Sequence, residues 1–199
     1  MEPDIGNCPH RPPPVSSPPM KPTLNADEWM RVLEKLAAAL PPQGAPVKLC
    51  LIGSAACLFG GMDGRTSADL DVWRPHSDYD RAELRAAAEA AGILFDPKAT
   101  LDPSKPYLQI VEPGLTHLGE FDPVPVDRIG RLEISRPPVE NLIAAKLIRA
   151  EPKDISDIRF LISLHRPDTA RIRSIVATLP PGSREQAEEN LVYLEVLTP

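Results

Sequence analysis

The fold of this chain is predicted by the stretch Val47-Lys-Leu-Cys-Leu-Ile-Gly-Ser54 together with Ala68-Asp-Leu-Asp-Val-Trp73. The first stretch is a short apolar run, typical of a buried strand, and its Gly-Ser end opens a short helix over 54–61. The second alternates apolar residues with Asp69 and Asp71, so it predicts a strand whose two carboxylates leave on one face. The centre of the chain is therefore expected to be strand, helix, strand.

Helix and strand patterns extend outward from this centre. Apolar residues recur at helical spacing over 25–40, where Asn25 and Glu28 have the spacing of a capping box. The other expected elements are a helix over 80–91, strands over 107–112, around 124–126 and over 132–134, and helices over 137–149, 154–164, 168–179 and from 183 onward. This order predicts an α+β fold, a small mixed β-sheet with helices packed on it and a C-terminal helical extension.

Proline divides the chain into regions. Of 25 prolines among 199 residues, eight lie in 1–23, where no apolar periodicity is present, and none lies between Val47 and Trp73. We expect 1–23 to be a disordered tail with polyproline II character. Residues 24–136 are expected to form the α/β core, and residues 137–199 a helical region packed on it.

Composition excludes several classes of protein. The three cysteines have neither a disulfide framework nor zinc-ligand spacing. No apolar stretch approaches the roughly 20 residues of a membrane span, and the N-terminus lacks the pattern of a signal peptide, so we expect a cytoplasmic protein without a membrane partner. The net charge is −6, yet residues 128–173 hold ten Lys/Arg against six Asp/Glu. Such a basic segment would suit an RNA or nucleotide partner.

Two features of the central stretch point to phosphate chemistry. Glycine at position 53 allows a sharp turn, after which backbone N–H groups and the Ser54 hydroxyl can bind a phosphate oxygen. Asp69 and Asp71 on one strand face favour a cation between them. Mg²⁺ prefers carboxylates combined with substrate phosphates, and paired ions can clamp a phosphoryl transfer. The pattern therefore predicts a site for Mg²⁺ or Mn²⁺ at Asp69 and Asp71.

Further motifs surround this pair. Arg65-Thr-Ser-Ala-Asp-Leu-Asp-Val72 precedes and includes the two aspartates, and Asn141-Leu-Ile-Ala-Ala-Lys-Leu-Ile-Arg149 is followed by Pro152-Lys-Asp-Ile-Ser-Asp157. With Gly53-Ser54, this ordered set resembles the nucleotidyltransferase superfamily of the DNA polymerase β-like fold. Within that superfamily it resembles the AbiEii toxin-like branch and short prokaryotic nucleotidyltransferase-like proteins. Over roughly residues 47–162, Ser67 stands where that branch usually has threonine.

The resemblance implies an activity and assigns residues to it. The enzyme would transfer a nucleoside monophosphate from an NTP to a hydroxyl acceptor, either RNA such as tRNA or a small molecule. It could act in a toxin–antitoxin or defence system with a cognate antitoxin or toxin partner. Lys146 would join Asp69 and Asp71 as a catalytic residue and contact the phosphates. The implied nucleotide-binding residues are Gly53, Ser54, Arg65, Ser67, Asp154 and Asp157.

One departure from the family pattern leaves an alternative open. The superfamily usually has a third carboxylate on a later strand, but the matching strand here carries Gln109. Glu112, Asp122 or Asp127 would have to substitute. If none does, the chain would be a catalytically degenerate nucleotide- or partner-binding module of the same fold.

Several candidates also have a purely structural interpretation. Asp69 and Asp71 could be solvated strand charges, Ser54 and Asp154 helix N-caps, Lys146 a surface lysine near a helix end, and Arg65 the partner of an aspartate in an ion pair.

Overall fold

A computed structural model describes residues 23–62, 64–97, 102 and 104–197. The tail predicted for 1–23 therefore lies outside the described residues, except for Thr23. The fold is α+β, as predicted. In chain order its elements are α1 (Ala26–Ala39), β1 (Val47–Ile52), α2 (Gly53–Leu58), β2 (Asp69–Trp73), the 3-10 helix η1 (Arg74–His76), α3 (Arg81–Ala90), β3 (Leu94–Phe95), β4 (Tyr107–Val111), β5 (Val124–Ile129), β6 (Leu132–Arg136), α4 (Val139–Arg149), α5 (Pro152–His165), α6 (Thr169–Ala177), α7 (Pro181–Glu189) and α8 (Val192–Leu197).

The strands form one mixed sheet in the order β3-β4-β2-β1-β6-β5. Strands β1 and β2 are antiparallel neighbours, as are β5 and β6, whereas β4 runs parallel to β2 and β6 runs parallel to β1. In the register of the central strands, Asp71 lies between Ile52 of β1 and Gln109 of β4. The strand–helix–strand centre is therefore confirmed, and it occupies the middle of the sheet.

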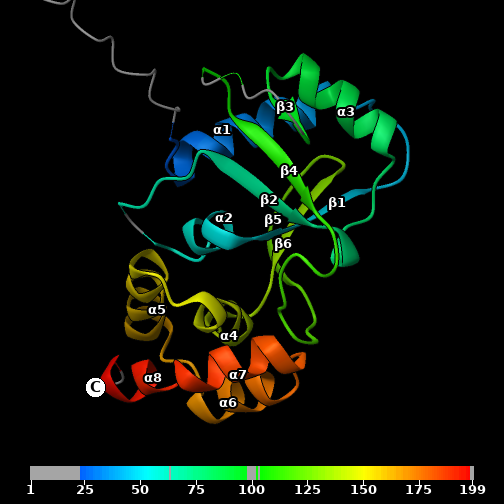
Figure 1. Cartoon of the computed structure of the whole chain (residues 1–199). Coiled ribbons are helices and arrows are strands. Elements are labelled where there is room, and N and C mark those ends of the chain that lie inside the picture. Colours follow the sequence, from blue (N-terminus) through cyan, green and yellow to red (C-terminus); the bar gives the residue numbers. More distant parts are fainter. Residues whose placement is uncertain (1–22, 63, 98–101, 103, 198–199) are drawn as a thin grey trace, which may run out of the picture.

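Strand alternation gives the sheet two different faces. Leu49, Leu70 and Leu108 point to a core shared with α1 and α3, and the capping box of Asn25 and Glu28 at the start of α1 is confirmed. The opposite face carries Cys50, Ile52, Asp69, Asp71, Trp73, Tyr107, Gln109 and Val111, because these positions are one residue out of phase with the buried leucines. This second face looks toward the C-terminal helices (Figure 1).

The C-terminal helices pack on one another and on α2. Ala56 and Cys57 of α2 share a hydrophobic core with buried residues of α4 and α5, such as Ile143 and Ile158. Because α2 also continues directly from β1, it ties the helical region to the sheet. No helix in the described part of the chain combines the length and the apolar character needed to cross a bilayer.

Two local expectations need correction, and one short strand was not predicted. The helix expected from 183 onward begins at Pro181 and stops at Glu189 as α7, and α8 then forms a separate helix. Asn190 stands between them, where its side-chain amide donates to the carbonyl of Leu147, 2.8 Å away. Helix α5 begins two residues earlier than expected, with proline in its first turn, which proline tolerates. The two-residue strand β3 lacks the length for a period-2 signal and was not predicted.

Candidate functional site

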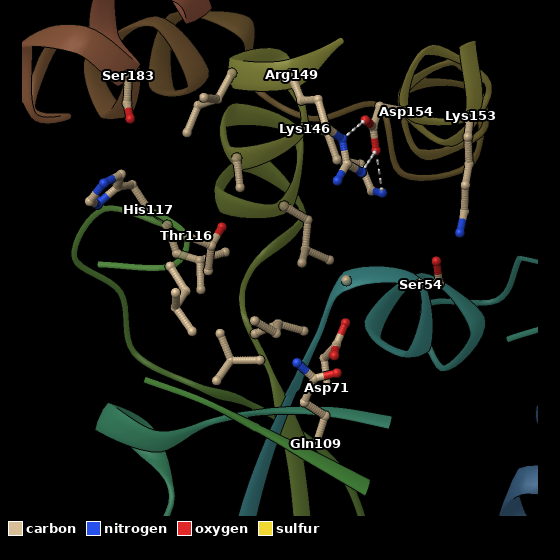
Figure 2. Close-up of a pocket in the computed structure, with 18 of the residues that line it drawn as sticks. Ser54, Asp71, Gln109, Thr116, His117, Lys146, Arg149, Lys153, Asp154 and Ser183 are labelled. Carbon is tan, nitrogen blue, oxygen red and sulfur yellow. Dashed lines mark hydrogen bonds and ion pairs between the residues drawn. The ribbon is translucent and has the colours of Figure 1, made fainter. Parts of the chain in front are cut away.

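A pocket of about 700 Å³ lies between the second face of the sheet and helices α4 and α5 (Figure 2). Its floor is formed by Ile52, Gly53, Ser54, Asp69, Asp71, Gln109 and Val111. Its roof is formed by Leu142, Ala145, Lys146, Ile148, Arg149, Lys153 and Asp154. The loop 114–118 and Ser183 also line it. The fold thus brings six predicted site residues to one cavity, namely Gly53, Ser54, Asp69, Asp71, Lys146 and Asp154.

Asp69 and Asp71 make the floor acidic. The two carboxylate oxygens of Asp69 accept hydrogen bonds from the hydroxyls of Ser67 and Tyr107, each 2.8 Å long. Burial, and then the negative charge of Asp69, raises the pKa of Asp71 to about 7. A carboxyl group with that pKa would be stabilised in its ionised form by a cation beside it.

The turn at Gly53 is closely fitted to Asp71. Gly53 has φ +64°, and a Cβ at this position would lie 2.8 Å from a carboxylate oxygen of Asp71. Glycine is therefore required both by the backbone conformation and by the space. Helix α2 begins at Gly53 itself, with Ile52 at the N-cap and no side-chain cap. The interpretation of Ser54 as an N-cap is thus wrong, and Ser54 instead lines the pocket (Figure 2).

A network of ion pairs forms the basic roof. The Lys146 ammonium lies 2.7 Å from Asp157 and 3.3 Å from Asp154. Arg149 binds Asp154 through two nitrogens, at 2.7 and 3.0 Å, and Arg65 lies 3.0 Å from Asp157. Both aspartates are fully or almost fully buried, with side-chain exposures of 0% and 1%. These contacts lock α4 to α5, and Arg65 ties both to the segment before β2.

The network settles three alternatives. Lys146 is 9% exposed, so the surface-lysine interpretation is wrong. Asp154 does not cap α5, because Glu151 holds the N-cap position and no side-chain hydrogen bond caps the helix. The ion-pair interpretation of Arg65 is confirmed.

Three predicted residues lie behind the cavity rather than in its wall. Arg65, Ser67 and Asp157 are not among the residues that line it. The Ser67 hydroxyl donates to Asp69, which lines the pocket. Arg65 pairs with Asp157, which in turn contacts the pocket residue Lys146. Their predicted contact with nucleotide therefore stays a prediction, and the observed contacts are those of residues that orient other side chains.

The place of a third carboxylate is taken by an amide. Gln109 pairs in register with Asp71 and lines the pocket beside it (Figure 2). Glu112 and Asp122 do not line the pocket, and Asp127 lies on the edge strand β5. Within the described ranges, no cluster of three or more His, Cys, Asp or Glu side chains could hold a metal ion. A metal held at Asp69 and Asp71 would therefore complete its coordination with other oxygens, such as those of substrate phosphates and water.

Sequence reasoning gave no role to several residues in the wall. Arg149 and Lys153 lie in the two motifs quoted above, and both line the pocket. Their positive charges, at the predicted end of one helix and just before the next, could have indicated a role at the site. Thr116 and His117 lie in a loop with no periodic pattern, so nothing in the sequence placed them here.

Comparisons with protein-family models, curated proteins and solved structures gave no match. The functional argument therefore rests on the residues and their geometry.

Proposed function

We propose that this protein is a metal-dependent nucleotidyltransferase that moves a nucleoside monophosphate from an NTP to a hydroxyl acceptor and releases pyrophosphate. One observation carries the proposal: the carboxylates of Asp69 and Asp71 face a basic roof across a pocket large enough for a nucleotide, beside the Gly53-Ser54 turn. A polyphosphate placed there would meet cations above it and, through a bound divalent ion, carboxylates below it.

The donor set fits Mg²⁺ or Mn²⁺ that arrives with a nucleotide. Magnesium sites commonly use one or two carboxylates and complete the coordination shell with substrate phosphates and water. Asp69 and Asp71 supply those two carboxylates, and a divalent ion beside them would oppose the two causes that raise the pKa of Asp71, namely burial and the charge of Asp69. When bound, the ion would neutralise charge that develops on the phosphoryl oxygens.

The chain's own residues would act by positioning and by charge. Ser54 would donate its hydroxyl to a phosphate oxygen, and the close approach allowed by Gly53 would keep that oxygen near Asp71. The roof would hold the polyphosphate in line for attack by the acceptor. Such placement supplies most of the catalysis in phosphoryl-type transfers.

The proposal also includes a class of acceptor and a biological partner. The basic stretch 128–173 supports an RNA acceptor such as tRNA, with a small molecule as the other choice. The resemblance to toxin-like nucleotidyltransferases supports a cytoplasmic role beside a cognate antitoxin or toxin partner.

Label transfer tests the activity. The protein is incubated with each α-³²P NTP, Mg²⁺ or Mn²⁺ and total RNA, or with small hydroxyl compounds, and products are separated by size. We expect Asp69→Asn and Asp71→Asn each to reduce labelling at least about a hundredfold. Asp127→Asn, an exposed carboxylate on β5 away from the pocket, is the matched control and should label normally. Labelling that survives both site substitutions would refute the proposal.

A second candidate function is favoured by Gln109. An amide at the position beside Asp71 cannot contribute charge to a metal site, which suits a module that binds a nucleotide without transferring it. Calorimetry separates the two candidates. Binding of an Mg²⁺–NTP complex without labelling of any acceptor would identify the binding module, and absence of binding would refute both.

A further inference from the structure

The roof of the pocket holds two lysines that differ in burial and in ion pairing. Lys146 is 9% exposed, and its ammonium contacts two buried carboxylates at 2.7 and 3.3 Å. Lys153, in the first turn of α5, is exposed and lines the same pocket, and among the described residues no hydrogen bond or ion pair engages it. The two lysines therefore differ in whether their charge is available to a ligand.

We propose that Lys153, together with Ser54, contacts the phosphates of the nucleotide. In this assignment Lys146 is a positioning residue, because its ammonium is paired with Asp154 and Asp157. This inference rests on the proposed function, because it assumes that the pocket takes a phosphate-bearing ligand. It reverses the role that the sequence resemblance implied for Lys146.

The cost of recruiting each lysine supports this division. Moving Lys146 toward a ligand would weaken its contacts with two buried aspartates, and a buried charge that loses its partner is strongly destabilising. Arg65 and Arg149 would keep partial hold of those aspartates, but neither replaces the contacts of the lysine. Lys153 would give up only water. Its flexible stem and three donors suit a polyphosphate, whose oxygens shift between substrate and product.

The position of Lys153 also fits the phosphate contact. Its side chain descends from α5 toward Ser54, on the side of the pocket opposite His117 (Figure 2). Lys153, Ser54 and Asp71 line the same cavity. A ligand between Ser54, Lys153 and Asp71 would bring its phosphates against the acidic floor and leave its other end toward the loop 114–118.

Binding measurements on charge variants test the assignment. Calorimetry with a non-hydrolysable NTP and Mg²⁺ is compared with calorimetry of the matching nucleoside, which lacks phosphates. We expect Lys153→Gln to weaken NTP binding about tenfold or more, since a charged hydrogen bond is lost. Nucleoside affinity and the melting temperature should not change, and Lys153→Arg should restore most of the NTP affinity. Arg159→Gln removes an exposed cation from the same helix outside the pocket and is the matched control.

The outcomes separate this inference from the proposed function. NTP binding by Lys153→Gln at wild-type strength would overturn the inference and leave the proposed function standing. A tenfold loss in Lys146→Met at unchanged melting temperature, with Lys153→Gln unaffected, would return the phosphate contact to Lys146. Absence of NTP binding by the wild-type protein would overturn both.

Discussion

Replacement of Lys146 by methionine probes the network that joins α4, α5 and the segment before β2. Methionine keeps the apolar stem of the lysine and removes the ammonium. In the wild-type protein that ammonium lies 2.7 Å from Asp157 and 3.3 Å from Asp154, and the side chain is 9% exposed. Removing one partner from a buried ion pair costs about 3–5 kcal/mol, because the other charge stays buried without compensation.

The surrounding contacts place the effect at the low end of that range. Asp157 keeps Arg65 at 3.0 Å, and Asp154 keeps Arg149 at 2.7 Å. We therefore expect Lys146→Met to lose about 3 kcal/mol of the free energy of unfolding. For a chain of this size this corresponds to a fall in Tm of about 6–12 °C.

Urea unfolding followed by circular dichroism measures this loss. Lys35→Met, at an exposed position of α1, is the matched control and should change stability by less than about 0.5 kcal/mol. The double variant Lys146→Met with Asp157→Asn removes both charges of the closest pair, so it should be at least about 1 kcal/mol more stable than the sum of the single effects predicts. A loss below about 1 kcal/mol for Lys146→Met, or strict additivity in the double variant, would refute the reasoning.

Three further predictions concern the floor of the pocket. Gly53→Ala should cost about 1–3 kcal/mol in urea unfolding, because φ is +64° and the new Cβ would meet Asp71 at 2.8 Å; unchanged stability would contradict the fitted turn. In metal-free protein the pKa of Asp71 is about 7, above the ordinary value of 3.8. Between these two pH values the folded protein keeps a proton on Asp71 that the unfolded chain releases. The free energy of unfolding therefore falls as the pH rises from about 4 to 7. The gain in unfolding free energy from Asp71→Asn should therefore be about 3 kcal/mol larger at pH 8 than at pH 5, and a pH-independent difference would count against the raised pKa. Gln109→Glu should strengthen Mn²⁺ binding roughly tenfold in calorimetry, since it adds a carboxylate beside Asp71; unchanged affinity would show that position 109 is outside the metal site.

The floor of the pocket was predictable because it depends on local geometry. Strand alternation alone places Asp69 and Asp71 on the same face, and the structure confirms that both line one cavity. The capping box at Asn25 and the break after β1 at Gly53 are also local signals, each contained within a few residues. The α+β class followed from the order of such signals.

The roof could not be predicted in the same way. Arg65 and Asp157 are 92 positions apart, and no periodic pattern states that they meet. The same holds for the pairing of Gln109 with Asp71, since the sequence showed an amide on a strand but not which strand would lie beside it. The helix predicted from 183 onward is divided at Asn190, whose side-chain amide donates to the carbonyl of Leu147 in another helix.

From the order of residues alone, this chain has a carboxylate pair next to a glycine turn and basic residues near its later helices. Packing decided which of those basic residues are paired with buried carboxylates. Once α4 and α5 pack against each other and α2, the Lys146 ammonium lies against Asp154 and Asp157, whose side chains are 1% and 0% exposed and therefore need partners within the protein. Lys153 comes seven positions later, in the first turn of the next helix, yet it stays exposed and faces the pocket. Two lysines of the same chemical type thus acquire different roles, because burial depends on the whole fold whereas strand alternation depends only on neighbouring residues.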